Sequence, residues 1–218
     1  VKMSSLEVLA FPNPFLRKEA SPVTTFDEAL SLLTDQMSIT MHEHEGVGLA
    51  ATQVGRDLQL LILSSYVFKS PEERKRLIDD PMGMGEDMVF INPEVVSQSD
   101  QEELDLEGCL SFPEVFIKVS RPVWVKVKAQ DVHGEWFEVE GEGFAARAIL
   151  HEMDHLNGKV MTDHLSYLAR KKALNKHKRV QKSIMIEREE AREEARLRGE
   201  SIEGELAPSL PFPPPTLE

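Results

Sequence analysis

Two histidines stand four residues apart in the segment HEMDHLNG, which covers residues 151–158, and a glutamate directly follows the first of them. Side chains at positions i and i+4 of a helix lie on one face, so His151 and His155 can bind one cation together. Glu152 lies about 100° further round the helix, where its carboxylate can reach a water molecule on that cation. The pattern predicts a hydrolytic metal site, and the alternative is a surface helix that matches the short HExxH pattern by chance.

Such a site needs at least one further ligand, and several downstream positions compete for this role. Met161 stands where the metzincin pattern HExxHxxGxxH has its third histidine, which excludes that family. The next glutamate after Glu152 is Glu187, too far along the chain to favour a thermolysin-like site. Asp163 and His164 remain as downstream candidates, and either of them would make the protein a metallopeptidase.

A more distinctive candidate is Cys109, the single cysteine of the chain, which lies in the segment LEGCLSFP at 106–113. A lone cysteine can be an inert buried thiol, a nucleophile paired with histidine, or a thiolate ligand. The adjacent Gly108 would let a backbone or a substrate approach closely. A thiolate with two imidazoles would make a three-ligand site whose fourth position stays open for water, as in catalytic sites.

The segment GVGLAATQ, at 46–53, is rich in small residues. Its glycines and alanines form a wall that a backbone can approach, and Gln53 supplies a side-chain amide donor. Taken alone, this stretch is explained by close packing or a tight turn. Its combination with the two other segments is far more specific than any one of them.

Two helices are expected to carry or flank these segments. Thr25 as an N-cap, with Glu28 three residues later and apolar residues at helical spacing, predicts a helix that ends near Glu45. Residues 144–157 show helical spacing again, with Gly158 placed to end the helix. The second helix would carry both histidines on one stripe.

Strands are expected between these helices. Residues 59–64 and 88–96 are typical of buried strands, and 123–141 alternates like a hairpin. The charged stretch 65–87, rich in proline and glycine, is expected to be a surface insertion. The pattern predicts an α+β fold in which antiparallel sheets surround the helix that carries the HExxH motif.

The chain divides into three parts by composition. Residues 1–168 are expected to form the catalytic domain, including the insertion. Residues 169–198 lack proline and glycine and predict a helical extension. The remaining 199–218 are rich in proline and have the composition of a disordered tail.

Bulk properties restrict the compartment and the partners. The formal net charge of -13 argues against a general affinity for nucleic acid or acidic lipid, so neither sequence-specific nucleic acid nor a membrane is expected as a partner. No long apolar run or secretory signal pattern is visible. One cysteine cannot form an intramolecular disulfide, which favours a reducing compartment, and the cytoplasm is the predicted location.

In their order and separations, GVGLAATQ, EGCLS and HEMDH closely resemble the three motifs of the peptide deformylase family, metal enzymes that remove the formyl group from N-formylmethionine on new polypeptides. The likeness runs from about Leu6 to Leu168, and LRKEASPV at 16–23 and DHLS at 163–166 also fit. The insertion and the chain after about Lys176 depart from the compact bacterial forms. Just after Ser111, the segment FPEVFIKV lacks the particular basic side chain expected from some relatives, so the resemblance does not extend to contacts with the distal substrate residues.

The resemblance implies a metal site in which Cys109, His151 and His155 hold one divalent ion and Glu152 is the general acid and base. The native ion of the family is typically Fe²⁺, and Zn²⁺, Ni²⁺ or Co²⁺ can occupy the same ligands. A catalytically inactive relative that only binds peptides is the alternative, and the presence of Gln53 beside these residues argues against it.

The resemblance also implies how N-formylmethionyl nascent peptides bind. The Gln53 amide and the backbone N–H of Leu110 would stabilise the oxyanion of the formyl group. The peptide main chain would lie as an added strand between 47–48 and 107–108. The methionine pocket would be lined by Val47, Phe144, Ala148 and the aliphatic part of Arg147, and structural packing would explain each of these residues equally well. The expected substrate-binding residues are Gly46, Val47, Gly48, Glu107, Gly108, Phe144, Arg147 and Ala148.

Two further expectations concern charged residues. Glu107 is expected to pair with Arg121 and so brace the cysteine segment, although a surface salt bridge would explain the pair equally well. The predicted C-terminal helix begins with a basic cluster, and the corresponding helix of bacterial relatives resembles a ribosome-docking element. A solvated helix face is the alternative. The cluster comprises Arg170, Lys171, Lys172, Lys176, Lys178, Arg179 and Lys182.

Overall fold

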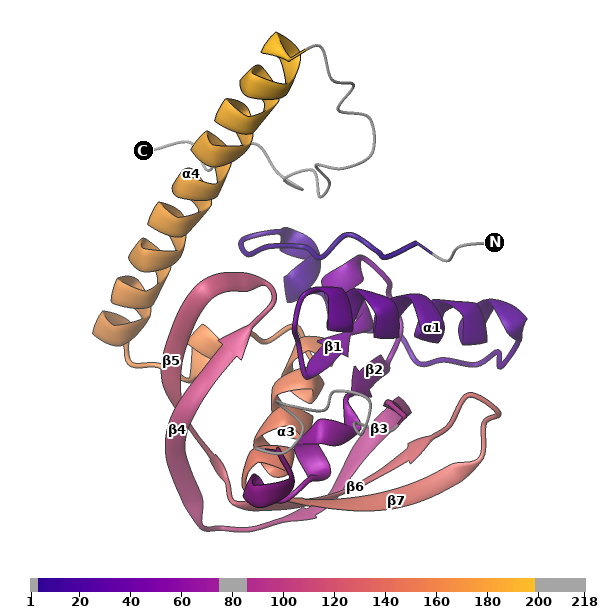
Figure 1. Cartoon of the computed structure of the whole chain (residues 1–218). Coiled ribbons are helices and arrows are strands. Elements are labelled where there is room, and N and C mark those ends of the chain that lie inside the picture. Colours follow the sequence, from indigo (N-terminus) through magenta and orange to yellow (C-terminus); the bar gives the residue numbers. More distant parts are fainter. Residues whose placement is uncertain (1–3, 75–85, 199–218) are drawn as a thin grey trace.

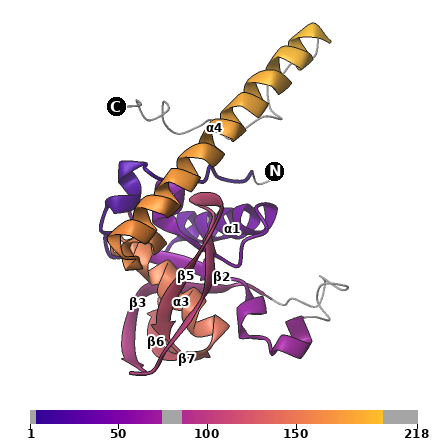
Figure 2. The ribbon, with the colours of Figure 1, turned by 90° about the vertical axis from the view of Figure 1, so that its left-hand side faces the viewer.

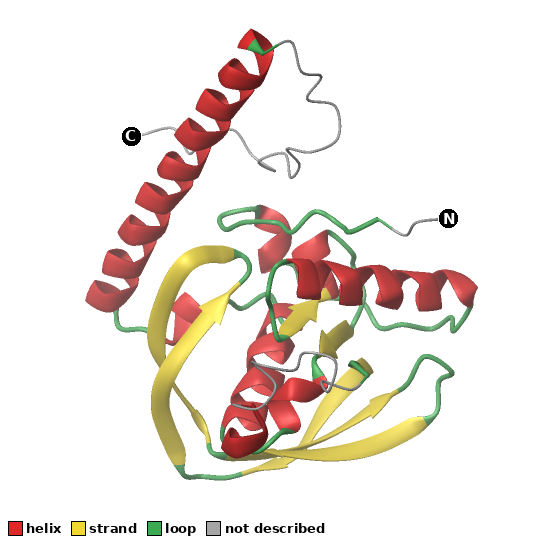
Figure 3. Cartoon of the chain, in the orientation of Figure 1, coloured by secondary structure: helices red, strands yellow, loops and turns green. Residues whose placement is uncertain are grey.

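Antiparallel sheets surround the helix that carries the two histidines (Figures 1 and 3). The computed structural model describes residues 4–74 and 86–198. The strands are β1 (Gly48–Ala50), β2 (Leu60–Leu63), β3 (Met88–Gln98), β4 (Glu102–Cys109), β5 (Phe112–Pro122), β6 (Trp124–Gln130) and β7 (Trp136–Glu142). The helices are η1 (Pro14–Arg17), α1 (Glu28–Glu43), η2 (Ala51–Val54), η3 (Ser65–Phe68), α3 (Phe144–Leu156), η5 (Met161–His164) and α4 (Tyr167–Leu197). The predicted α+β class with antiparallel sheets and a C-terminal helix is confirmed.

The larger sheet has five strands in the order β1-β2-β3-β6-β7, and every neighbouring pair is antiparallel. Both faces are covered at β2: Leu61 and Leu63 belong to the core shared with α3, whereas Leu60 and Ile62 belong to the core shared with α1. All four side chains are fully buried. Burial on both faces explains why this strand is a continuous apolar run rather than an alternating one.

The smaller sheet is a two-stranded ribbon of β4 and β5, which the sequence analysis did not predict. Cys109 pairs with Phe112, so Leu110 and Ser111 form the connection between the strands. Most of β4 is exposed and its sequence alternates acidic residues with leucines, while β5 buries Val115 and Val119. In Figure 1 the ribbon curves around one side of α3 and the larger sheet lies on the other.

The first helix begins two residues later than predicted. Asp27 is the N-cap of α1, and its carboxylate accepts a hydrogen bond from the Leu30 N–H at 2.9 Å. Thr25 as the N-cap was therefore wrong, because the aspartate two residues on performs the same function. The helix ends at Glu43, close to the predicted Glu45.

The first half of the C-terminal helix α4 packs on β5 and η5. Ala173 and His177 are buried on the face toward β5, where His177 lies 4.8 Å from the Phe112 ring between ring centroids. Figures 1 and 2 show the second half extending away from the sheets. The expected tail at 199–218 and the centre of the insertion lie outside the described residues. No described helix is long and apolar enough to span a membrane.

Candidate metal centre

The helix α3 directs the HExxH side chains into the interior. His151 and Glu152 are each 6% exposed and His155 is 1% exposed. The two imidazole centroids are 5.1 Å apart, as expected for positions i and i+4 on one face. Burial of all three polar side chains excludes the chance match on a solvated surface helix.

Cys109, at the end of β4, completes a cluster of donors with the two histidines. One ligand atom from each residue lies within 4.8 Å of the others, and the Cys109 Sγ is 3.3 Å from His155 Nε2. Bond lengths of about 2.3 Å to sulfur and 2.0 Å to nitrogen at tetrahedral angles require a separation of about 3.5 Å. The donor atoms therefore fit one transition-metal ion with an open fourth position.

The competing ligands Asp163 and His164 point to other partners. Asp163 forms an ion pair with Arg17 and accepts a hydrogen bond from the Val160 N–H at 2.9 Å. His164 Nε2 lies 2.6 Å from Asp154 Oδ2. Among the described residues, neither belongs to the group of donors that could share an ion. The metallopeptidase alternative therefore has no support from the geometry.

Glu107 orients the imidazole of His151 through a hydrogen bond. The imidazole Nδ1 of His151 donates to Glu107 Oε2 at 2.8 Å, which leaves its Nε2 for a metal ion. Arg121 donates to both carboxylate oxygens, at 2.7 and 3.0 Å, and its Nη1 donates to Asp154 at 2.6 Å. The predicted pairing of Glu107 with Arg121 is confirmed, and it is a buried interaction rather than a surface salt bridge.

Burial and hydrogen bonds shift the pKa values of the site in different directions. Burial raises the pKa of Glu152 to about 7. Burial lowers the pKa of His155 to about 3, so its imidazole is neutral and would need to lose no proton to bind an ion. For His151, hydrogen bonds with Cys109 and Glu107 outweigh burial and raise the pKa. A cation held by these donors would favour the ionised form of the nearby Glu152 and lower its pKa.

Gln53 lies beside the cysteine and is held in one orientation. Its Oε1 accepts from the Ala50 N–H at 2.9 Å, while Nε2 donates to Ser111 Oγ at 3.1 Å and approaches Cys109 Sγ at 3.5 Å. The side chain is 1% exposed. Its amide N–H₂ group is therefore directed at the donor cluster. Leu110, the other predicted oxyanion residue, lies in the turn next to Cys109.

The predicted substrate glycines lie where other elements come close. A β-carbon on Gly46 would lie 2.9 Å from Leu110 Cδ1, and one on Gly108 would lie 2.7 Å from the Phe116 ring. The neighbour that needs the small Gly108 is therefore an aromatic side chain of β5. Val47 packs against the same apolar core as Ala148.

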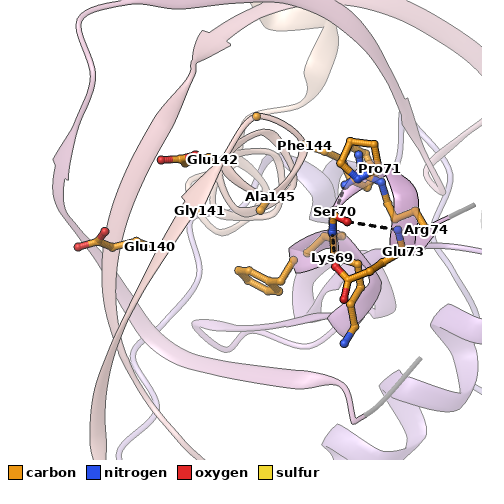
Figure 4. A pocket seen from close by; sticks show the side chains of 13 residues that line it. Lys69, Ser70, Pro71, Glu73, Arg74, Glu140, Gly141, Glu142, Phe144 and Ala145 are labelled. Carbon is orange, nitrogen blue, oxygen red and sulfur yellow. Dashed lines mark hydrogen bonds between the residues drawn. The ribbon is translucent and has the colours of Figure 1, made fainter. Parts of the chain in front are cut away.

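Phe144 and Arg147, both expected near the methionine side chain, differ in their surroundings. Phe144 lines a pocket shared by residues 67–74 and 140–145 (Figure 4), and none of the three metal donors lines that pocket. The guanidinium of Arg74 lies 5.0 Å from the centre of the Phe144 ring. The guanidinium of Arg147, in contrast, is buried against Glu107 and strand carbonyls. No local sequence pattern indicates these partners of Arg147, because they lie on β4 and β5.

A partly buried cysteine and two buried imidazoles beside a buried carboxyl, within an α+β fold, are the arrangement of a metal-dependent hydrolase. A family model described as polypeptide deformylase matches residues 5–171. The chain belongs to this family, whose members remove the N-formyl group from nascent polypeptides, and it is a hydrolase of that kind.

The matches to individual relatives cover nearly the whole length of each relative. A peptide deformylase of Hahella chejuensis is 44% identical over 181 residues, covering 81% of this chain and 98% of that protein. A crystal structure of a peptide deformylase from Legionella pneumophila has a TM-score of 0.68 and 40% identity, covering 81% of this chain and 97% of that chain. One from Ehrlichia chaffeensis has a TM-score of 0.73 and 33% identity, covering 83% and 99% respectively.

Proposed function

We propose that Cys109, His151 and His155 hold the catalytic ion of this deformylase, with Fe²⁺ as the native metal. The convergence of these three donors within 4.8 Å is the observation that carries the proposal. One thiolate with two imidazoles also suits Zn²⁺, Ni²⁺ or Co²⁺, so these ions are expected to substitute. When bound, the ion supplies a Lewis acid and an acidified water molecule.

Glu152 is the general acid and base of the proposed reaction. Its Oε2 is buried without a hydrogen-bond partner among the described residues, so it is available to accept a proton from the attacking water. The same carboxyl then delivers the proton to the departing amine, and formate is the other product. The Gln53 amide and the Leu110 N–H are proposed to donate to the oxyanion that forms on the formyl oxygen.

The substrate main chain is proposed to lie between the two sheets. β1 is the last strand of its sheet and β4 belongs to a two-stranded ribbon, so each has an edge without a neighbouring strand in the described structure. Gly46 lies just before β1 and Leu110 just after β4, and a β-carbon built on Gly46 would lie 2.9 Å from Leu110 Cδ1. A formylated peptide would therefore add a strand between 47–48 and 107–108, using backbone hydrogen bonds that tolerate many sequences. Val47, Ala148 and Phe144 remain the proposed neighbours of the methionine side chain.

Formate release from formyl-Met-Ala-Ser tests this proposal. Activity should disappear with a chelator and return with Fe²⁺ or Co²⁺. Glu152→Gln should retain one bound ion but lose about 100- to 10,000-fold in kcat, because only the proton transfer is removed. Cys109→Ser should instead change metal retention. Unchanged metal binding by Cys109→Ser, or full activity of Glu152→Gln, would overturn the assignment.

We also propose that the basic start of α4 docks on the ribosome. Six of its seven basic residues are exposed, whereas Arg170 pairs with Asp163 at 3.1 Å. Truncation after Leu168 should abolish binding, but it would also uncover the surface that His177 covers. Reversing the charge of Lys171, Lys172 and Lys178 is the sharper test. Binding should weaken and lose its steep salt dependence, whereas Lys128→Glu on β6 should have no effect.

The compartment and the domain division follow as proposals from the same features. A thiolate ligand is protected from oxidation in a reducing compartment, which supports the cytoplasm. The family match ends at residue 171, near the proposed end of the catalytic domain at 168. The helical extension at 169–198 and the tail at 199–218 would then be additions to that domain.

A further inference from the structure

The carboxylate of Glu107 is held by two arginines rather than one. Its Oε1 accepts from Arg121 Nε at 2.7 Å and from Arg147 Nη1 at 3.0 Å. Its Oε2 accepts from Arg121 Nη2 at 3.0 Å and from His151 Nδ1 at 2.8 Å. The Glu107 side chain is only 3% exposed. Each oxygen therefore has two donors, which fixes the plane of the carboxylate.

The two arginines differ in what balances their charge. Arg121 contacts a second carboxylate, Asp154, at 2.6 Å. Arg147 donates to the carbonyls of Glu103 and Val119, each at 2.7 Å. Among the described residues, Glu107 is the only carboxylate within ion-pair distance of Arg147. The positive charge of Arg147 therefore acts on Glu107, which is also the hydrogen-bond acceptor of His151.

We propose that Arg147 is a positioning residue for the metal ligand His151, acting through Glu107. This inference rests on the proposed metal site. The guanidinium fixes Oε1, so the carboxylate cannot rotate away from His151 Nδ1. The guanidinium also withdraws negative charge from Glu107. The hydrogen bond to Glu107 therefore makes the His151 imidazole less electron-rich than a hydrogen bond to an isolated carboxylate would. The bound ion would then remain a stronger Lewis acid.

A purely structural role and a pocket role make different predictions for the same residue. If Arg147 only joins α3 to the strands, its loss should lower stability and leave the metal ligands unchanged. If its aliphatic part lines the methionine pocket, its loss should change the preference among first residues. Positioning predicts a change at the metal itself together with a lower kcat and an unchanged KM.

The test uses the Co²⁺-loaded full chain with Arg147→Met. The visible bands of Co²⁺ should change, and kcat for formyl-Met-Ala-Ser should fall about 10- to 100-fold at constant KM. The preference for formyl-Met over formyl-norleucine substrates should stay the same. One ion should remain bound, because two effects of the substitution on metal affinity oppose each other. Loss of the positive charge of Arg147 favours binding of the cation, whereas a less firmly held Glu107 carboxylate disfavours it. Arg147→Lys, which keeps the charge and a donor, should restore most of the activity.

Val119→Ala is the matched control, because it loosens the same part of β5 without removing a hydrogen bond to Glu107. It should lower stability and leave the Co²⁺ bands and kcat unchanged. If Arg147→Met does not fold, Arg147→Gln keeps a donor for the strand carbonyls and should show the same spectral change and a lower kcat. Wild-type bands and kcat in whichever of these variants folds would overturn the inference. Absence of a sulfur-to-cobalt band in the wild-type protein would instead overturn the proposed metal site.

Discussion

Gly48 of β1 and Glu152 of α3 approach so closely that no side chain fits between them. A β-carbon built on Gly48 would lie 2.6 Å from Glu152 Oε1 and 2.9 Å from its Cγ. Real β-carbons do not come this close to other atoms, so one of the two elements would have to move. The glycine therefore sets the position of the proposed general base.

Gly48→Ala should lower deformylase activity by roughly 100-fold, because displacement of a reacting group by about 1 Å has an effect of that size. The measurement is kcat for formyl-Met-Ala-Ser, with the melting temperature followed in parallel. Gly46→Ala is the matched control, since its nearest neighbour is the flexible end of Leu110 at 2.9 Å. Its effect should be smaller. Equal activity of Gly48→Ala and the wild type would show that Glu152 can relocate without loss.

Glu107→Gln should destabilise the protein strongly. It leaves Arg121 and Arg147 buried, each with less than its full complement of negative charge. Removing one partner of a buried ion pair typically costs about 3 to 5 kcal/mol in the free energy of unfolding. Urea titration of the variant and the wild type measures this loss of free energy of unfolding. Glu102→Gln on the same ribbon, whose carboxylate accepts from the exposed Ser120 hydroxyl at 2.6 Å, should cost far less. A loss below about 1 kcal/mol for Glu107→Gln would contradict this account of the site.

Removal of the metal should lower the melting temperature of the wild-type protein. An ion that binds only the folded chain stabilises it by about 2.7 kcal/mol when free metal is 100-fold above Kd. Calorimetry with and without a chelator, at fixed protein concentration, checks this. For Cys109→Ser, the chelator should change the melting temperature much less. A wild-type melting temperature that does not respond to the chelator would be incompatible with a bound ion at these ligands.

The sequence could predict those features that depend on local pattern. The spacing of His151 and His155, the apolar run at 60–63 and the alternation of the β6–β7 hairpin are all local signals, and the structure contains each element. The β4–β5 ribbon was missed although β4 alternates leucines with acidic residues, because only two leucines carry this pattern and the strand is largely exposed. The partners of Arg147 were missed for a related reason, since the strand carbonyls that accept from it are far away in the sequence.

The cap of α1 was misplaced by two residues because Thr25 and Asp27 are both good N-caps. Local sequence does not distinguish them, whereas in the structure the Leu30 N–H donates a hydrogen bond to the carboxylate of Asp27. The assignment of Cys109 needed the spacing of three motifs, because a single cysteine fits several roles. Its position beside His155 depends on the ribbon turn, which no local pattern indicated.

The docking of α4 should make stability depend on pH through His177. Its side chain is 2% exposed, its Nε2 donates to the Phe11 carbonyl at 2.6 Å, and its Nδ1 is buried without a partner among the described residues. Burial lowers the pKa of His177, although the bond to Phe11 opposes this. The unfolded chain therefore binds a proton at a higher pH than the folded chain does. The contribution of His177 to the free energy of unfolding is fully present above pH 6.5, the ordinary pKa of histidine. It is lost as the pH falls through the pKa of His177 in the folded protein.

Urea unfolding at a series of pH values between 7.5 and 5 checks this prediction. The free energy of unfolding of the wild type should fall more steeply with acidification than that of His177→Gln, which has no group to titrate but keeps a donor for Phe11. The difference in slope cannot exceed about 1.4 kcal/mol per pH unit, the limit for one proton. His133→Gln, at an exposed position in the β6–β7 turn, serves as the control and should leave the slope unchanged. Identical slopes for the wild type and His177→Gln would mean that α4 accommodates the charged imidazole.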